Sequence, residues 1–458
     1  MLSRLAGDIP KNDLEDSLLQ FWRNFSKQYP SHEVFQFSEM RGIPLRRTLP
    51  CFLHGDEGRH HKKTGIMILS IQGVLGRGSA PFHKKVFKIW SKKTTQALNI
   101  GGHSFRSRLL LMALPKRFYS QDPQNFLTMF DTIVSDLVDM EQVGFEYEGV
   151  RWRLQVLGLK GDLPFLTKAA SLERHYLRAA RTENPKNPPV GMCFLCAAGQ
   201  TNVPYEDFTD QAAWLTASFS RPWLTEPAFL KLSLVRSGPE DFLKPDIWHC
   251  FHGGMGMDFA ASSLVEMLQL VPGTNIKDKC RSMNRLLAEW IESGNPRPHS
   301  GPFLPERVGL TSYQVCPDAG WSKFNDTRIY CKFIQDILER KVDEIWDNST
   351  LLQILHGVQQ INKCMSILFS GGLWLTSQQA LDAGAHGRKW IFEYDALAKQ
   401  AYANGMQRFP LLQKIHMLDH HFRDLENYAK QLLYILNPAA ASVQMDEETR
   451  GSVEFIFL

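Results

Sequence analysis

The chain has 458 residues, of which 43% are hydrophobic and 22% charged, proportions that are ordinary for a globular protein. Its formal net charge of +4 is nearly balanced, so bulk charge gives no argument for nucleic-acid binding. No apolar run approaches the roughly 18 residues of a membrane span, and the opening residues lack a secretory signal. We therefore expect a soluble protein in a reducing, intracellular compartment, with core enough for two to three domains or for one domain that carries a large insertion.

The first strong pattern is a pair of predicted strands that follows a predicted helix over residues 12–25. Residues 49–58 resemble a short buried strand whose last inward position carries Asp56, and residues 63–75 resemble a longer strand that turns back beside it. A carboxylate inside a sheet is costly to bury unless it has a partner or holds a metal. Asp56 is therefore the first candidate functional residue.

A second acid closes a later strand. The apolar pattern predicts a strand within residues 101–115, an amphipathic helix over 123–143, and a strand over 150–162 that ends in Asp162. A helix is expected to follow from Leu163. Asp56 and Asp162 are thus candidates for one site on neighbouring strands, although each can also be a polar strand end or turn residue.

The apolar pattern predicts that the second half of the chain is helical. After a Pro- and Asn-rich loop over 184–189, apolar residues from about 205 to 435 recur at helical intervals without strand alternation. The order of elements favours an α/β core that helices interrupt or extend.

Two pairs of potential metal ligands stand far apart in the sequence. The spacing of Cys193 and Cys196 lets both thiolates reach one Zn²⁺, which needs two more ligands. His416 and His420 lie one turn apart on a predicted helix, with His421 as the adjacent alternative. The plainer interpretations are two buried thiols and a solvated helix face. Because the ligand counts are complementary, we hypothesise a single site.

Two further groups of residues have a functional and a plain interpretation. Asp246 can cap the following helix, with His249 one turn inside it, or both can support a metal site from outside its ligands. Basic runs over 59–63 and 83–93 are usually solvated surface but would also suit phosphate contacts. The candidate DNA-binding residues are Lys62, Lys63, Lys84 and Lys85.

The order of these features resembles the DDE/D transposase superfamily: a strand acid, a later strand-end acid, CxxC, DxxH, a long helical stretch, HxxxH and a final acid. The layout is most similar to CACTA (EnSpm)-type transposases and to the catalytic core of the V(D)J recombinase. The chain also resembles large multicopy protein families of protist genomes. The likeness covers roughly residues 45–450 and rests on spacing and order.

The resemblance implies an α/β fold with an RNase H-like mixed sheet core that a large all-helical insertion interrupts. Four parts are expected. They are an N-terminal helical segment (1–45), a first part of the core ending in the CxxC knuckle (46–200), the helical insertion (201–405), and the HxxxH helix with the closing part of the core (406–458).

The resemblance also implies two metal sites. Asp56 and Asp162 would hold two Mg²⁺ or Mn²⁺ ions together with a third acid, expected at Glu447. Glu448, Glu426 and Glu393 are alternatives for that acid. A structural Zn²⁺ would tie the insertion to the core through Cys193, Cys196, His416 and His420.

The implied function is that of a nuclear, transposase-derived strand transferase or nuclease acting on double-stranded DNA, away from membranes, and compatible with a homodimer. The two ends depart from the family pattern, because the first 45 residues are few for a DNA-binding domain and only ten residues follow Glu448. A catalytically degenerate form of the enzyme is therefore also compatible with the sequence. The alternatives are a non-catalytic, zinc-stabilised DNA- or protein-binding module on the same fold, and an unrelated α/β protein.

Overall fold

The computed structural model describes most of the chain, in two compact units. The described residues are 5, 9, 11–59, 65–76, 96–101, 104, 107–176, 189–308, 310, 315–317, 319–321 and 323–446. The first unit consists of Met1–Asp246, Leu368–Ala380 and Tyr428–Leu458, and the second of Ile247–Ile367 and Leu381–Asn427. The chain is a mixed α/β protein with many helices, as expected.

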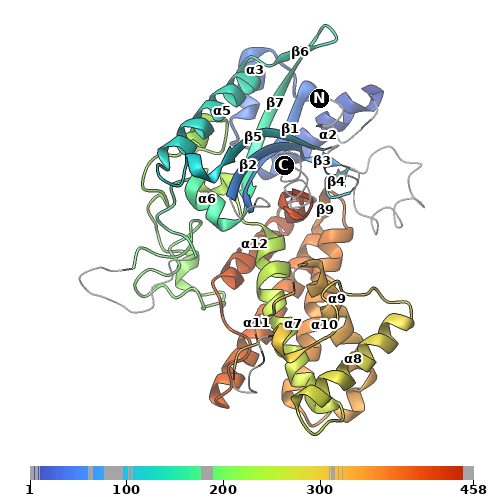
Figure 1. The fold of residues 1–458 in the computed structure, drawn as a ribbon. Helices are drawn as coiled ribbons and strands as arrows, with labels where there is room; N and C mark the ends of the chain where they lie inside the picture. The colour runs from blue at the N-terminus through green and yellow to red at the C-terminus, as the bar shows by residue number, and fades with distance from the viewer. Residues whose placement is uncertain are drawn as a thin grey trace. The chain divides into compact units, whose positions relative to one another are not determined.

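The first unit is built on a mixed sheet (Figure 1). Its strands are β1 (Thr48–Arg59), β2 (Gly65–Gly73), β5 (Arg108–Pro115), β6 (Phe145–Tyr147), β7 (Val150–Gly161) and β8 (Leu243–Lys244). The strand order is β5-β2-β1-β7-β6, and β8 also pairs with β7. The β1–β2 and β2–β5 pairs are antiparallel, whereas β7 runs parallel to both β1 and β8.

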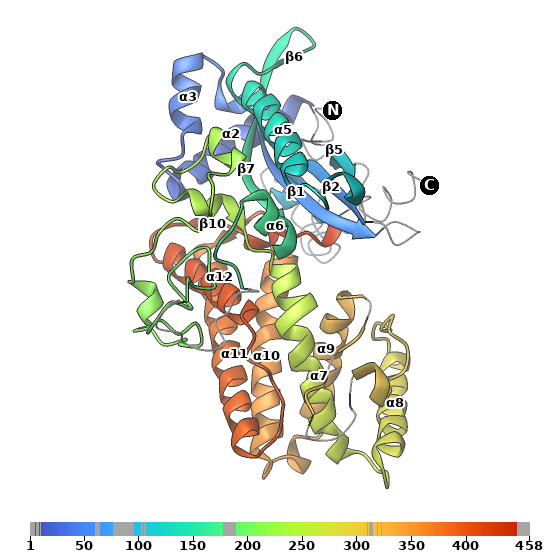
Figure 2. The ribbon, with the colours of Figure 1, turned by 60° about the vertical axis from the view of Figure 1, so that its left-hand side comes forward.

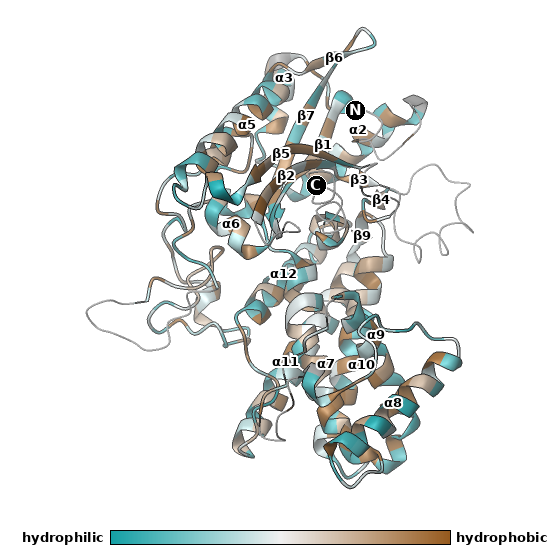
Figure 3. Ribbon diagram, in the orientation of Figure 1, coloured by the Kyte–Doolittle hydropathy of each residue, from teal (hydrophilic) through white to brown (hydrophobic). Residues whose placement is uncertain are grey.

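The central strands form the hydrophobic middle of this unit. All nine residues of β2 are buried, and β7 is buried from Trp152 to Gly161. Near-continuous apolar runs are typical of strands that are covered on both faces, and the ribbon is strongly hydrophobic along β2 (Figure 3). A polar side chain inside these strands therefore needs a partner.

Helices cover the sheet. The unit contains α2 (Lys11–Gln28), α3 (Val34–Arg41), α5 (Gln124–Gln142) and α6 (Leu163–Ala169). α5 packs against β7 (Figure 2) with a buried stripe that includes Phe126, Phe130 and Val134. Trp22 of α2 donates from its indole Nε1 to the Thr48 carbonyl at 2.9 Å, which fixes that helix to the start of β1.

The stretches predicted as helical contain less helix than expected. The helix after Asp162 stops at Ala169, because Ser171 adopts a left-handed backbone with φ of 47°. Between α6 and β8, the described residues form short 3₁₀ helices, at Ala213–Leu215, Ala228–Lys231 and Pro239–Phe242, and two isolated β-bridges. The predicted helical block also contains strand β9 (Trp374–Thr376), which pairs with β10 (Tyr434–Leu436). A second short pair joins β3 (Leu75–Gly76) to β4 (Ala97–Leu98).

The second unit is helical. It begins with the π-helix η7 (Trp248–Met255), and its helices are α7 (Gly256–Glu266), α8 (Ile276–Glu292), α9 (Asn325–Arg340), and most of α10 (Ser349–Ser370), α11 (Ser377–Ala403) and α12 (Lys414–Ala429). Aromatic rings fill its core: Trp390 lies 5.5 Å from Phe251 and 6.0 Å from Phe259, between ring centroids. None of the described helices combines the length and apolarity needed to cross a membrane.

Candidate metal centre and acidic sheet face

Asp56 and Asp162 follow neighbouring positions on two adjacent parallel strands. β1 pairs with β7 as far as Gly55 opposite Gly161, and each glycine is followed directly by one of the acids. Asp56 is only 2% exposed, and Asp162 is half-buried just after β7. β1 extends one residue beyond the predicted strand at each end and continues to Arg59 beside β2, and Asp56 lies inside it.

The two glycines let α6 approach the strand ends closely. A Cβ atom on either Gly55 or Gly161 would overlap the ring of Phe165. Asp162 is the N-cap of α6, and its Oδ1 accepts a hydrogen bond of 2.8 Å from the Phe165 backbone N–H. Gly55, Gly161 and Asp162 are therefore explained locally by the packing of this helix.

A buried ionic cluster lies against the same sheet, and sequence reasoning missed it. The carboxylate of Asp446 accepts hydrogen bonds from Lys160 Nζ at 2.7 Å and from Arg108 Nε at 3.2 Å. All three side chains have no solvent exposure. The Nδ1 atom of His54 lies 4.0 Å from Asp446 Oδ1. The sequence does contain a signal for this cluster: Lys160 interrupts the apolar pattern of a predicted strand.

The cluster lies on the face of β1 that carries Asp56. The β1–β7 register pairs His54 with Lys160, and the two-residue alternation of a strand puts His54 and Asp56 on one face, away from Gly55. Burial lowers the pKa of His54, and the charges of Asp446 and Asp56 oppose that shift. Burial alone would raise the pKa of Asp446, but Lys160 and Arg108 outweigh it and hold that pKa below its usual range.

Asp246 is tied to the segment that carries Asp446. It is 3% exposed, and its Oδ1 accepts a hydrogen bond of 3.2 Å from the Val443 backbone N–H. The next helix, η7, has Ile247 as its N-cap, with no side-chain cap bond. His249 lies in η7, where its ring centroid is 5.6 Å from that of Phe324.

Some predicted site residues lie outside the part of the chain that the structure describes. They are the expected third acid and the candidate DNA-binding lysines, namely Glu447, Lys62, Lys63, Lys84 and Lys85. Their assignments stay predictions.

The two cysteines lie in a tight backbone knuckle. An antiparallel bridge joins Val190 to Gln200, and inside it the Met192 N–H donates to the Ala198 carbonyl at 2.9 Å. Gly199 has a φ of 83°, and a side chain there would collide with Met192. The pattern Gly-Met-Cys-Phe-Leu-Cys-Ala-Ala-Gly therefore encodes a closed turn.

Backbone groups in this turn point at the sulfur atoms. The Leu195 N–H donates to Cys193 Sγ at 3.2 Å, and the Ala198 N–H donates to Cys196 Sγ at 3.4 Å. In the metal-free chain, burial and the neighbouring thiol raise the pKa of Cys193. Arg174, which donates to the Ser220 carbonyl at 2.6 Å, adds a positive charge close to both sulfurs. Such donors and charges favour thiolates, the form that binds metals.

The two histidines lie one turn apart on α12, as predicted. His416 is fully buried, His420 is half-buried, and their Nε2 atoms are 3.1 Å apart. One ligand atom from each of Cys193, Cys196, His416 and His420 lies within 4.8 Å of the other three. This group could bind a metal ion such as zinc. Four protein ligands complete the tetrahedral shell of Zn²⁺ and leave no open position, which is typical of a structural site.

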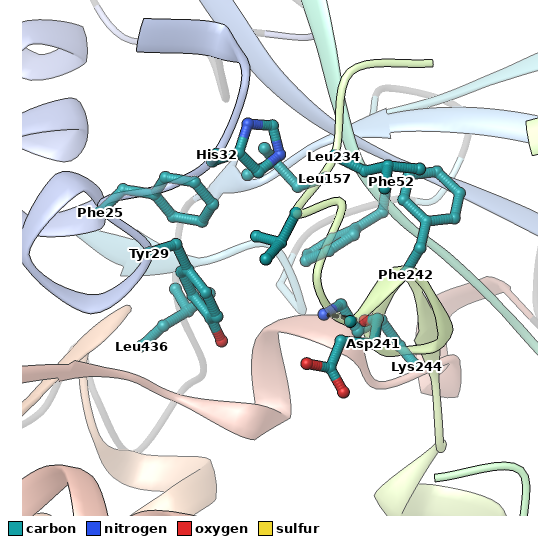
Figure 4. A pocket seen from close by; sticks show the side chains of 12 residues that line it. Phe25, Tyr29, His32, Phe52, Leu157, Leu234, Asp241, Phe242, Lys244 and Leu436 are labelled. Carbon is teal, nitrogen blue, oxygen red and sulfur yellow. Dashed lines mark hydrogen bonds between the residues drawn. The ribbon is translucent and has the colours of Figure 1, made fainter. Parts of the chain in front are cut away.

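A separate small cavity lies within the first unit (Figure 4). Its volume is about 30 Å³, room for one or two water molecules. It therefore does not accommodate an organic substrate. Its lining is mainly aromatic and aliphatic and includes Phe25, Tyr29, His32, Phe52, Leu157 and Phe242.

Comparison with known proteins found no family model and no curated protein that matches the chain. What the structure itself defines is an α/β protein with a mixed sheet, a buried ionic cluster on one sheet face, and a two-cysteine, two-histidine group suited to a metal ion.

Proposed function

We propose that the chain is a transposase-derived protein with an RNase H-like core, and that it works as a zinc-stabilised module that binds double-stranded DNA. The observation that carries this proposal is the Cys193, Cys196, His416 and His420 group. These pairs are more than 200 residues apart in the sequence, yet their ligand atoms gather in one place. A shared zinc site is what the transposase-like order of motifs implies.

The sheet supports the RNase H-like part of the proposal. In such a sheet the first and fourth long strands are adjacent, and here β1 and β7 are adjacent and parallel. The helices after Ile247 would then be the insertion. A nuclear location belongs to the same proposal, which is also compatible with a homodimer.

Zinc would act on structure. Bound by four protein ligands, Zn²⁺ would act as a structural ion, and its binding free energy would add to folding. The backbone N–H groups of Leu195 and Ala198 orient the two cysteine sulfur atoms by donating hydrogen bonds to them.

Half-exposed lysines at the end of β1 offer a surface for phosphates. Lys116 and Lys168 both pair with Glu57, and their side chains are 50% and 41% exposed. Glu57 follows Asp56 directly in β1, so Lys116, just after β5, and Lys168, in α6, both pair with the neighbour of that acid. Each phosphate contact contributes about one unit to the slope of log affinity against log salt.

The first experiment measures binding of a fluorescent DNA duplex by the zinc-loaded chain across a range of salt concentrations. We expect salt-dependent binding, a slope lowered by about one unit in Lys116→Gln and again in Lys168→Gln, and weaker binding by Cys193→Ser. Cys316→Ser, a half-buried cysteine outside the group, is the matched control. Absence of duplex binding by zinc-loaded wild type would refute the proposal.

A second candidate function is a metal-dependent DNA strand transferase or nuclease. The pairing of Gly55 with Gly161 favours it, because each glycine directly precedes one of the two acids. Divalent ions held by such carboxylates would stabilise the charges of phosphodiester transfer. Duplex cleavage with Mg²⁺ or Mn²⁺ that is present in wild type and absent in Asp162→Ala would establish this candidate. Equal cleavage in both would indicate a contaminant.

A further inference from the structure

Two buried protein cations occupy the sheet face where the transposase resemblance implies divalent metal ions. We propose that Lys160 and Arg108 replace those metals as the counter-ions of the acidic face, so that this face is a closed ion-pair site. The inference rests on the RNase H-like core proposed above, and it makes the chain a non-catalytic member of that architecture.

The position of the cations is the first argument. Lys160 lies on β7 two residues before Asp162, and its strand partner His54 lies two residues before Asp56. Arg108 begins β5, on the other side of β2. Both cations meet on Asp446, which is therefore neutralised by the protein itself.

The balance of charge is the second argument. The charged groups that act on His54 or Lys160 are three acids and two bases, namely Asp56, Asp246, Asp446, Lys160 and Arg108. Two divalent ions carry four positive charges and need several carboxylates whose charge is available. Here the two resident cations already neutralise Asp446, and each of them repels an incoming metal ion.

The fixation of both cations is the third argument. Lys160 Nζ also donates to the Ser442 carbonyl at 2.9 Å. Arg108 donates to Ser107 Oγ at 2.7 Å and to the Asn99 carbonyl at 3.0 Å. Neither side chain reaches solvent, and displacing either one would take a partner away from the buried carboxylate of Asp446. The carboxyl groups present therefore do not fit a two-metal centre.

The test is a titration of the zinc-loaded chain with Mn²⁺, in which electron paramagnetic resonance measures the Mn²⁺ that stays free. Prior saturation with zinc keeps the Cys and His group from contributing to the signal. We expect no difference between wild type and Asp56→Asn at millimolar Mn²⁺. Mn²⁺ uptake by wild type that Asp56→Asn abolishes would overturn the inference, and this comparison requires no change to either cation.

A second variant tests the role of the cation directly. Lys160→Gln removes one positive charge and keeps a hydrogen-bond donor, so we expect at least tenfold tighter Mn²⁺ binding, which the added change Asp56→Asn removes. Lys332→Gln, an exposed lysine of α9, is the control and is expected to match wild type. A folded Lys160→Gln chain with wild-type Mn²⁺ binding would contradict the inference.

DNA binding measured on the same samples separates the two proposals. Duplex binding with Asp56-dependent Mn²⁺ uptake would remove the inference and leave the proposed DNA-binding function intact. If the wild-type chain does not bind the duplex, the proposed DNA-binding function is refuted, whatever the result for Mn²⁺.

Discussion

Asp446 illustrates how one buried charge depends on its partners. Its carboxylate is held between Lys160 and Arg108, which come from different strands, and all three are removed from water. Such an arrangement is weak evidence of net stabilisation, because desolvation of the ions offsets their attraction. Breaking it is costly, since the remaining charges stay buried.

The change Asp446→Asn should lower the free energy of unfolding by about 3–5 kcal/mol, because it leaves two buried cations without a matching anion. Urea denaturation of both proteins measures the difference. Glu57→Gln is the control: Glu57 also meets two lysines, but these are half-exposed, so a loss below about 1 kcal/mol is expected. Equal losses in the two variants would contradict this account.

His32 should make the fold sensitive to acid. Burial first, then the charges of Lys244 and Arg236, lowers its pKa from 6.5 to about 3. Between these values the unfolded chain binds a proton that the folded chain does not, so stability is complete above pH 6.5 and is lost as the pH falls toward 3. The contribution of His32 to the free energy of unfolding amounts to at most about 5 kcal/mol.

The variant His32→Asn does not titrate, and its side-chain oxygen can still accept the hydrogen bond that Val34 N donates to His32 Nδ1. Its stability should fall less steeply than that of wild type between pH 6.5 and 4, measured by urea denaturation at each pH. His356→Asn, an exposed histidine of α10, should keep the wild-type profile. Parallel profiles for wild type and His32→Asn would be evidence against the prediction.

At the scale of elements, the contact of α6 with the ends of β1 and β7 depends on two missing side chains. Gly55 and Gly161 leave the space that the Phe165 ring fills, and Asp162 caps the same helix. The positions of both acids are thus coupled to the placement of one short helix.

Gly55→Ala should destabilise the protein by about 1–3 kcal/mol, because the added methyl group overlaps a buried ring. The double variant Gly55→Ala/Phe165→Leu should lose less than the sum of the single changes, since both act on one contact. Thermal and urea unfolding give the four values of the cycle. Gly357→Ala is the control: its Cβ would meet neighbours at 3.4 Å inside α10, where alanine is the better helix former. Strict additivity would show that the overlap is relieved elsewhere.

At the scale of the whole molecule, the Cys and His group could join two distant stretches of the chain. We expect one zinc per chain in wild type by elemental analysis, and none in Cys193→Ser. Chelation should lower the free energy of unfolding by more than about 2 kcal/mol, several degrees in Tm, because metal binding adds to folding. Cys316→Ser should keep its zinc and its Tm. A wild-type chain that contains no zinc after growth in zinc-supplemented medium would refute the site.

Local patterns account for what sequence reasoning predicted well. α2, α5 and β7 begin and end close to their predicted bounds, because their apolar periodicity records which face each one buries. The spacing of Cys193 with Cys196, and of His416 with His420, likewise defines each ligand pair within one turn of backbone. Residues 205–246 show the limit, since helical spacing there accompanies only short 3₁₀ helices and β8.

By itself, then, the sequence determined the strands that carry Asp56 and Asp162, and the two halves of a zinc-type ligand set. Only the tertiary structure decided what surrounds them. Arg108 and Asp446 are 338 residues apart, and nothing local predicts that they meet. The difference is physical: periodicity and spacing are properties of neighbouring residues, whereas the charge balance of a buried face is set by elements that fold onto it from distant parts of the chain.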